Sequence, residues 1–302
     1  MIQVLLSTYN GARYLRPLLD SVLAQDVPGV SVLVRDDGSD DDTATLLETY
    51  AATHPGVRVL RGENIGFALS FMRLLEVSSP AAQYVAFCDQ DDIWQSEKLS
   101  RAVNGLSHCP QEVPALYCSR LTVVDQRLNP LGWSRIPKRE LTFRNALVEN
   151  CLAGCTMLMN QAARRILLRA IPKDLVAHDW WTYLIVSAFG TVCFDRESRV
   201  LYRQHASNVV GIRLGSIRRL HFKIRRYWRI GSAHPVVRQA EELNRLYGPS
   251  LSSEQRRILG RFLGGSGKQF WGRLRYACFS DVYRQSAFDN LVLKALISLN
   301  RL

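Results

Sequence analysis

The chain has 302 residues, of which 47% are hydrophobic and 22% charged, which is an ordinary globular composition with enough length for one large domain and an appendage. Seven cysteines without a Cys-x-x-Cys pair argue against a disulfide framework and against a zinc site. The net charge of +12 is unevenly distributed, because residues 198–240 hold ten Arg or Lys and no Asp or Glu. That stretch predicts a partner for its charge.

Two apolar segments bear on cellular location. Residues 1–6 have no basic leader and no small-residue cleavage site, so they do not resemble a signal peptide, and we expect a cytoplasmic protein. Residues 180–194 form the longest uncharged apolar stretch, bracketed by Asp179 and Asp195. The stretch is too short for an ordinary membrane span, which predicts a buried helix instead.

In the first hundred residues, apolar runs rich in β-branched side chains alternate with helical patterns. This alternation is typical of stacked βαβ units, and predicts an α/β fold with a mostly parallel central sheet flanked by helices. We expect strands near residues 4–7, 30–35, 57–61 and 84–88.

A polar cluster follows each of these four strands. In open α/β sheets, ligands bind beyond the carboxyl ends of the strands, where loops can present side chains without disrupting the core. Four clusters at one edge of a sheet predict a single site. They are residues 7–11, 36–40, 64–66 and 89–92.

Within the second cluster, Asp36 and Asp37 come directly at the strand end. A carboxylate there can accept a hydrogen bond from a base N–H or from ribose hydroxyls. Asp41 or Asp42 is instead expected to cap the following helix.

The fourth cluster, residues 89–92, holds three carboxylates, whose repulsion must be offset by a cation or by hydrogen-bond donors. Mg²⁺ or Mn²⁺ would bind one or two of them together with substrate phosphates, and would neutralise charge on a departing nucleoside diphosphate. The alternative is a loop in which Asp92 or Ser96 caps the next helix.

Residues 111–212 contain further strands, expected at 115–121, 155–159, 192–194 and 199–204. No linker separates them from the first half, so we expect them to complete the same sheet. After Gly211 the chain becomes basic and helical, which places a domain boundary there.

Taken in order, the motifs of residues 2–211 resemble the inverting family 2 glycosyltransferases of the GT-A fold. The cluster at 36–39 resembles that family's nucleotide-binding turn, and Asp89-Gln90-Asp91 resembles its DXD motif. The resemblance implies that Asp36 contacts the base, Asp89 the ribose or metal, and Asp91 the metal. The implied nucleotide-sugar-binding residues are Thr8, Tyr9, Asn10, Asp36, Asp37, Asn64, Gly66 and Asp89.

The sequence His178-Asp179-Trp180-Trp181 stands where the family carries its catalytic carboxylate. The resemblance makes Asp179 the general base that takes a proton from the acceptor hydroxyl. A helix-terminal carboxylate that favours the helix dipole is the alternative. Gly154 and Trp180 are implied on the acceptor side, with a buried strand and a core tryptophan as their alternatives.

Residues 202–211 look like the Arg-x-His-x-x-Asn element of bacterial rhamnosyltransferases in the same family. This resemblance makes His205 a third metal ligand or a phosphate donor, and suggests dTDP-rhamnose as the sugar donor. A histidine with a purely structural role is the alternative.

Residues 217–230 have the pattern of a basic amphipathic helix, which suits an anionic membrane surface. We therefore divide the chain into a GT-A glycosyltransferase domain and a basic helical C-terminal region. The domain spans 1–212, with a nucleotide-sugar half at 1–110 and an acceptor half at 111–212, and the C-terminal region spans 213–302.

The expected function is a metal-dependent hexosyl transfer from a nucleotide sugar to a saccharide acceptor, lipid-linked, at the inner face of a bacterial membrane during surface polysaccharide synthesis. Two alternatives stay open: a nucleic-acid-binding protein that uses the basic stretch, and a nucleotide-sugar-binding protein without catalysis. Clustered acidic loops argue against nucleic acid, because they repel its phosphates.

Overall fold

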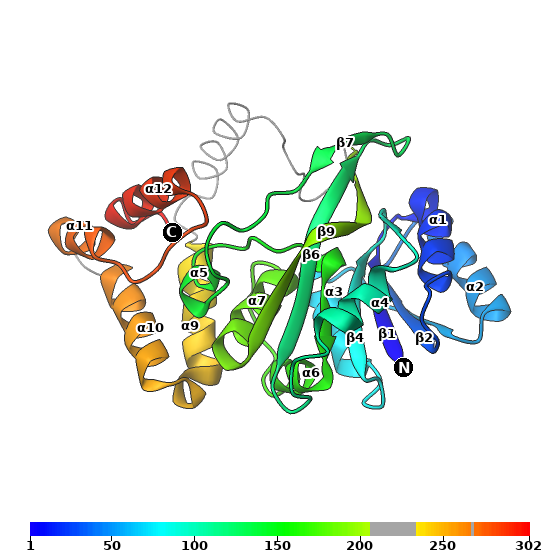
Figure 1. Ribbon diagram of the computed structural model, residues 1–302, viewed down its shortest axis with the longest axis horizontal. Helices are drawn as coiled ribbons and strands as arrows, with labels where there is room; N and C mark the ends of the chain where they lie inside the picture. Colours follow the sequence, from blue (N-terminus) through cyan, green and yellow to red (C-terminus); the bar gives the residue numbers. More distant parts are fainter. Residues whose placement is uncertain (206–233, 267–268) are drawn as a thin grey trace.

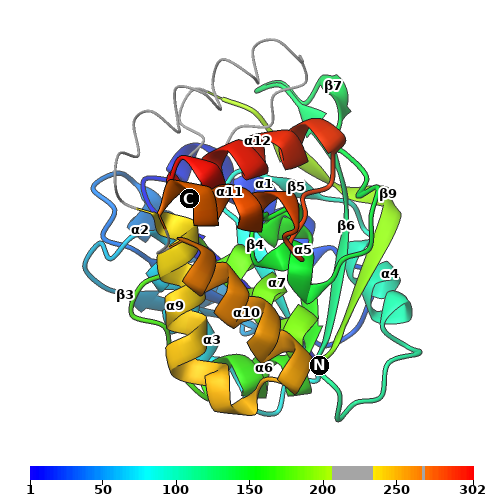
Figure 2. The same cartoon turned by 90° about the vertical axis from the view of Figure 1, so that its left-hand side faces the viewer.

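The computed structural model describes residues 1–205, 234–266 and 269–302 (Figure 1). Their strands form one mixed sheet with the order β3-β2-β1-β4-β8-β6-β9-β5, and β7 pairs with β6 outside this path. Helices cover both faces of the sheet (Figure 2). The basic helix expected at 217–230 and most of the motif at 202–211 lie outside the described residues.

The nucleotide-sugar half is built from parallel strands, as predicted. β1 (Ile2–Thr8) lies between β2 (Val30–Asp36) and β4 (Tyr84–Asp89), and β3 (Val57–Arg61) extends the sheet beyond β2. Thr8 pairs in register with Asp36, and Ser7 with Asp89. Because the strands are parallel and in register, the polar clusters that follow them meet at one edge.

Alternation along β1 explains why helices pack on both faces. Val4 and Leu6 belong to one hydrophobic core, whereas Leu5 belongs to the other, as expected when successive side chains point to opposite faces. The first core includes buried residues of α1 (Ala12–Leu23) and α2 (Thr43–Thr53), and the second includes those of α3 (Phe67–Val77).

The acceptor half completes the same sheet, which confirms the expectation. β8 (Leu158–Asn160) is antiparallel to β4 and to β6 (Ala115–Val124), whereas β9 (Thr191–Arg203) is parallel to β6. Further elements of this half are β7 (Pro130–Trp133), α5 (Phe143–Ala146) and α6 (Gln161–Leu168).

Three details of this half differ from the expected elements. The two strands expected at 192–194 and 199–204 are one continuous strand, β9, and the strand expected at 155–159 begins only at Leu158, because η1 (Gly154–Thr156) precedes it. The helix expected over 180–194 is wrong in its last five residues, since α7 (His178–Phe189) ends before Gly190. At Gly190 the backbone passes so close to Pro114 that an added Cβ would lie 1.8 Å from the Pro114 carbonyl oxygen.

The cap expected for the helix after the fourth cluster is wrong. The residue that precedes α4 (Lys98–Gly105) is Glu97, so neither Asp92 nor Ser96 caps that helix, and Asp92 is fully buried beside β5 (Ile93–Trp94). Asp42 precedes α2, but its side chain makes no capping hydrogen bond. Asp41 accepts the amide hydrogen of Thr43, the first residue of α2, so of the two expected caps it is Asp41 that binds the helix start.

The C-terminal helices pack against the acceptor half. They are α9 (Pro235–Tyr247), α10 (Ser253–Ser266), α11 (Phe270–Cys278) and α12 (Ala287–Ser298), with the turn η2 (Gly248–Ser250) after α9. Tyr247 lies 6.3 Å from the ring of Trp181 and donates a hydrogen bond to the Ile166 carbonyl oxygen. Among the helices that the structure describes, none is both long and apolar enough to cross a membrane.

Candidate active site

The loop after β1 is fixed to the acidic turn after β4 by the side chain of Gln90. Its Oε1 accepts hydrogen bonds from Thr8 Oγ1 at 2.7 Å and from the Tyr9 amide at 2.8 Å, and its Nε2 donates to the Tyr9 carbonyl oxygen. Gly11 is required beside it, because an added Cβ would lie 2.5 Å from Gln90 Oε1. No role was predicted for Gln90 by itself, since its position between two aspartates carries no signal of its own.

Asn10 joins the loop after β1 to the loop after β2. Its backbone lies in the left-handed region at φ 49°, which asparagine tolerates better than most residues. Its amide donates to Ser39 Oγ, and its Oδ1 accepts from the Asp40 amide at 2.8 Å. Asp36 Oδ1 accepts two hydrogen bonds from Ser39, so these residues form one rigid rim.

Asp37 shapes the loop after β3. Its carboxylate accepts from the amides of Ile65 at 3.1 Å and Gly66 at 2.9 Å and pairs with Arg35, and both charged side chains are buried. Arg35 in turn donates to the Glu63 carbonyl oxygen. Because these bonds occupy the Asp37 carboxylate, its geometry suits positioning of the loop better than direct contact with a ligand.

The loop that Asp37 holds contains two of the predicted nucleotide-binding residues. Asn64 Oδ1 accepts a hydrogen bond from the Gly66 amide at 3.1 Å. Gly66 lies at φ 81°, a conformation that side-chain-bearing residues rarely adopt. The sequence Asn-x-Gly is therefore needed for the shape of this turn.

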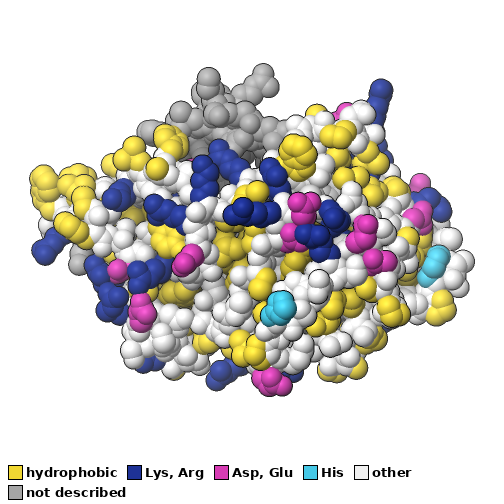
Figure 3. All heavy atoms as spheres, viewed as in Figure 1, with side chains coloured by type: hydrophobic (Ala, Val, Ile, Leu, Met, Phe, Trp, Pro, Cys, Tyr) yellow, Lys and Arg dark blue, Asp and Glu magenta, His cyan; other side chains and the backbone are white. Residues whose placement is uncertain are grey.

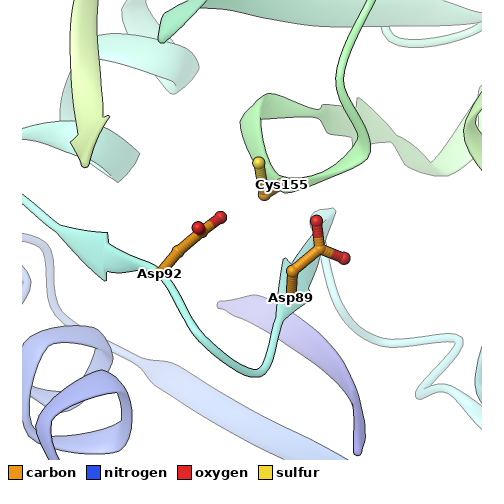
Figure 4. Close-up of side chains that lie close together, drawn as sticks. All are labelled: Asp89, Asp92 and Cys155. Atoms are coloured by element: carbon orange, nitrogen blue, oxygen red, sulfur yellow. The ribbon is translucent and has the colours of Figure 1, made fainter. Parts of the chain in front are cut away.

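Asp89, Asp92 and Cys155 form a compact cluster, with ligand atoms all within 4.8 Å of one another. Figure 4 shows the two carboxylates on the turn between β4 and β5, facing Cys155 on η1. Asp92 Oδ1 accepts from the Arg203 amide, whereas its buried Oδ2 has no hydrogen-bond partner in the described part of the chain. Burial of a carboxylate oxygen without a partner costs free energy, and a bound cation would offset that cost.

The electrostatics of this cluster agree with its geometry. Burial, with the nearby charges of Asp91 and Asp179, raises the pKa of Asp89 to about 7. Burial also raises the pKa of Asp92 and of the Cys155 thiol well above their usual values. No role in a cation site was predicted for Cys155, because a single cysteine without a second one at ligand spacing gives no sequence signal of such a site.

Asp91 and His205 are brought together from distant parts of the sequence. The His205 Nε2 atom lies 2.8 Å from Asp91 Oδ2, and the imidazole stacks on Tyr14 with ring centroids 4.9 Å apart. Arg203 donates to the Asp91 carbonyl oxygen and lies over the same Tyr14 ring. The end of β9 therefore holds the acidic turn from one side.

Asp179 lies in the first turn of α7, where Oδ1 accepts a hydrogen bond from the Trp180 amide. Burial raises the pKa of Asp179, and its charge contributes to the raised pKa of Asp89, so the two carboxylates lie close. The backbone of η1 packs closely against the first turn of α7 at Gly154. An added Cβ at this glycine would lie 3.3 Å from the Cβ of Asp179 and 2.8 Å from Nε2 of His178.

The side chains on either side of Asp179 are packed inward. His178 stacks on Phe71 with ring centroids 3.8 Å apart, and burial lowers its pKa to about 3. Trp180 is partly buried and donates from Nε1 to the Ala146 carbonyl oxygen at 2.6 Å, whereas Trp181 is fully buried in the core. The structure thus separates the two tryptophans, and only Trp180 retains exposed surface beside Asp179.

The donor atoms at this edge fit a divalent cation. Asp89, Asp91 and Asp92 offer carboxylate oxygens, which Mg²⁺ and Mn²⁺ prefer, and His205 offers an imidazole nitrogen that suits Mn²⁺ better than Mg²⁺. The Cys155 thiol is a softer group, and its raised pKa keeps its proton on. The oxygens and the imidazole are therefore the better ligands.

Solved structures with a similar fold are glycosyltransferases. Staphylococcus aureus TarS in complex with UDP-GlcNAc has a TM-score of 0.61 at 18% identity, over 99% of this chain and 87% of that one. A Pyrobaculum calidifontis mannosyltransferase, PcManGT in complex with GDP-Man and Mn²⁺, has a TM-score of 0.54 at 20% identity, over 99% of this chain and 80% of that one. These likenesses confirm the predicted GT-A fold.

Relatives of known sequence include dTDP-rhamnosyl transferase RfbG of Shigella flexneri, 27% identical over 68% of this chain and 73% of the relative. A putative teichuronic acid biosynthesis glycosyltransferase of Bacillus subtilis, TuaG, is 29% identical over 53% of this chain and 61% of the relative. An uncharacterised protein of Mycobacterium tuberculosis is 28% identical over 67% of this chain, and the match spans only 58% of that longer relative.

The sequence model described as glycosyl transferase family 2 matches residues 3–167, which are more than half of the chain and include all four polar clusters that follow the early strands. The chain therefore belongs to glycosyl transferase family 2.

Proposed function

We propose that this glycosyltransferase is an inverting, divalent-metal-dependent enzyme that moves a sugar from a nucleotide donor to a saccharide acceptor. The observation that carries the proposal is the acidic cluster at the carboxyl end of β4, in which Asp89 and Asp92 lie beside Cys155 of η1. In the same turn an added Cβ on Gly154 would lie 3.3 Å from the Asp179 Cβ. A cluster for a cation and a separate base are the two parts that such a transfer needs.

The donor is proposed to bind across the rim formed by the loops after β1, β2 and β3. Asp36 would accept a hydrogen bond from the base, and Asp89 one from the ribose. Tyr9 is 42% exposed at this rim and offers its ring to the base. Thr8, Asn10, Asp37, Asn64 and Gly66 would shape the pocket through the hydrogen bonds described above.

We propose dTDP-rhamnose as the donor. Support comes from the likeness to dTDP-rhamnosyl transferase RfbG and from the Arg203-x-His205 pattern at the end of β9. The similar solved structures hold UDP-GlcNAc and GDP-Man, so the pocket of this fold accepts several nucleotides. The donor must therefore be tested directly.

The cation is proposed to be Mg²⁺ or Mn²⁺, held by Asp89, Asp91 and His205, with the orphaned Oδ2 of Asp92 behind them. When bound, such an ion would neutralise the negative charge of the donor diphosphate. The Mn²⁺ in the PcManGT structure supports this proposal.

In the proposed reaction, Asp179 accepts the proton of an acceptor hydroxyl. The hydroxyl oxygen forms a bond to the anomeric carbon as the bond from that carbon to the diphosphate oxygen breaks on the opposite face, so the configuration inverts. Burial raises the pKa of Asp179, which makes the ionised carboxylate a stronger base. Gly154, proposed on the acceptor side, lets the backbone of η1 pack against this residue, because an added Cβ would lie 3.3 Å from the Asp179 Cβ.

The acceptor is proposed to be a lipid-linked saccharide at the inner face of a bacterial membrane, used in surface polysaccharide synthesis. The name of the Bacillus relative, a putative teichuronic acid biosynthesis glycosyltransferase, supports a role in polysaccharide synthesis. Trp180, beside Asp179, would contact the acceptor sugar.

A thermal-shift screen of UDP-, GDP- and dTDP-sugars with Mn²⁺ tests the donor, and a transfer assay with the best donor then tests catalysis. We expect dTDP-rhamnose to raise the melting temperature only when Mn²⁺ is present. No shift with any nucleotide sugar, together with strongly salt-dependent binding of DNA or RNA, would replace the proposal by a nucleic-acid-binding function. Binding without transfer would indicate a non-catalytic sensor.

A further inference from the structure

The last two helices and the residues that directly follow them carry large hydrophobic side chains that are exposed in the part of the chain that the structure describes. Trp271 is 76% exposed, Phe279 73% and Leu291 66%. Together these exposed side chains make what we call the α11–α12 surface: Phe270, Trp271, Phe279, Phe288, Leu291 and Leu299. Hydrophobic side chains gather at the end of the molecule formed by α11 in Figure 3.

The side chains of α12 are exposed on a regular, packed helix and not at a frayed chain end. Leu293, Leu296 and Ile297 face the core and are buried. Phe288 and Leu291 lie on the opposite side, so the helix is apolar on both faces. A helix that packs only on its own domain normally has a polar outer face, and contiguous exposed apolar area marks an interaction site.

The charges around these side chains indicate the partner. Between residues 269 and 302 there are five Arg or Lys and only two carboxylates. Asp281 pairs with Arg261, and the buried Asp289 accepts a hydrogen bond from Ser286. The exposed charged side chains of this segment are therefore all cationic: Arg275, Lys294 and Arg301.

We propose that the α11–α12 surface docks this enzyme on an anionic lipid bilayer. Apolar side chains at the acyl boundary with cations at the headgroups are the composition that such a surface binds. Two copies facing each other through this surface would bring like charges together, and nucleic acid would leave the apolar side chains uncovered. The proposal extends the proposed function. It rests on that function in one respect, since a lipid-linked acceptor would require the enzyme to work at a membrane.

The α11–α12 surface is firmly connected to the catalytic half. Within the loop between the two helices, the Gln285 amide donates to Glu149 at 2.6 Å, and the Tyr283 carbonyl oxygen accepts from Asn145 Nδ2. Asn145 Oδ1 also accepts from Tyr183 of α7, the helix whose first turn contains Asp179. A docked α11–α12 surface would therefore hold the candidate base in a fixed orientation to the bilayer.

The orientation suits a lipid-linked acceptor. In both views of the ribbon, α12 lies toward the end of the molecule that is remote from the amino terminus (Figures 1 and 2). β1 begins at that terminus, so the site lies at the end of β1 that is remote from the amino terminus. Docking through α12 would bring the site edge toward the membrane.

Sedimentation with vesicles tests the proposal on the full chain, with 70:30 phosphatidylcholine:phosphatidylglycerol vesicles compared with pure phosphatidylcholine. We expect preferential binding to the anionic vesicles. The triple variant Trp271→Ser, Phe279→Ser, Leu291→Ser should reduce binding by about tenfold or more. Val113→Ser, which changes an exposed apolar residue ahead of β6, is the control and should bind as wild type does.

Equal vesicle binding by the wild type and the triple variant would overturn the proposal, since the basic segment at 217–230 would then account for all binding. A concentration-dependent dimer that the triple variant abolishes, without vesicle binding, would instead identify an interface between copies. Donor hydrolysis in solution should be unchanged in the triple variant. If the proposed transferase activity fails, that assay is silent for both proteins while vesicle binding is still measurable.

Discussion

His205 Nε2 lies 2.8 Å from Asp91 Oδ2, so a residue at the end of β9 contacts the turn after β4 across 114 positions of sequence. The imidazole is held in place by Tyr14, on which it stacks. Because the ring is fixed, its nitrogen can orient the carboxylate of Asp91 or share a cation with it.

Removal of this contact should weaken the cation site. We expect His205→Ala to raise the Mn²⁺ concentration needed for half-maximal activity by about 10–100-fold, because partners that orient metal ligands have effects of this size. Mn²⁺ titration of transfer at saturating donor measures it. His108→Ala, at an exposed histidine after α4, is the control. An unchanged Mn²⁺ requirement would assign His205 a structural role.

Asp179→Asn should remove the base while keeping the shape of the site. We expect kcat to fall by about 10²–10⁴-fold with little change in the donor KM, because the proton transfer occurs only in the transition state. Asp174→Asn is the matched control, since Asp174 is exposed on the preceding loop and forms a surface ion pair with Arg238. Full activity of Asp179→Asn would eliminate its assigned role.

Asp36 and Asp37 are neighbours that should respond differently to the same change. Asp37→Asn leaves the buried Arg35 without its partner, so we expect the free energy of unfolding to fall by about 3 kcal/mol. Asp36→Asn should leave stability nearly unchanged and raise the donor KM by about tenfold or more, as the loss of a hydrogen bond to a charged group would. Urea unfolding and donor titration measure the two effects. The reverse pattern would show that Asp37 contacts the nucleotide.

The buried imidazole of His178 should make stability depend on pH. Its pKa is about 3 in the folded chain and 6.5 when exposed, so the unfolded state binds a proton first as the pH falls. The stabilisation is complete above pH 6.5 and is lost as the pH falls toward 3, by up to about 1.4 kcal/mol per pH unit.

The variant His178→Gln stays neutral at every pH and isolates this contribution. Urea unfolding of both proteins at pH 7, 5.5 and 4.5 should show a shallower loss of stability in the variant. Other titrating groups, such as the carboxyls with raised pKa, affect both proteins alike and cancel in the comparison. Identical slopes would mean that His178 is protonated in the folded state.

The sequence predicted the parallel half of the sheet well, because its strands have a strong apolar pattern and each ends in a polar cluster. It predicted the helix after Asp179 too long, because the apolar residues of α7 continue into β9 without a polar break. The helix ends at Gly190, a residue type common at helix C-termini, where the backbone also packs against Pro114.

The sequence predicted the carboxylates of the candidate site, but it did not predict the residues that position or surround them. Asp89, Asp91 and Asp179 stand out because their motifs resemble those of the family, and because clustered carboxylates repel one another unless their charge is offset. Gln90 and Cys155 do not stand out, since their importance depends on what lies opposite them in space. The roles of all these residues in binding and catalysis stay predictions until the variants are made.

The hydrogen bonds that join residues 145–149 to the loop from Tyr283 to Gln285 limit where this chain can be truncated. A chain that ends at residue 212 would lack the hydrogen-bond partners of Asn145 and Glu149, and these two residues lie beside α7. Engineers who wish to exchange the C-terminal helices between relatives, to redirect an enzyme to another surface, should therefore transplant residues 143–149 with them. The two segments form one structural unit that has to be exchanged together, although more than 130 residues separate them along the chain.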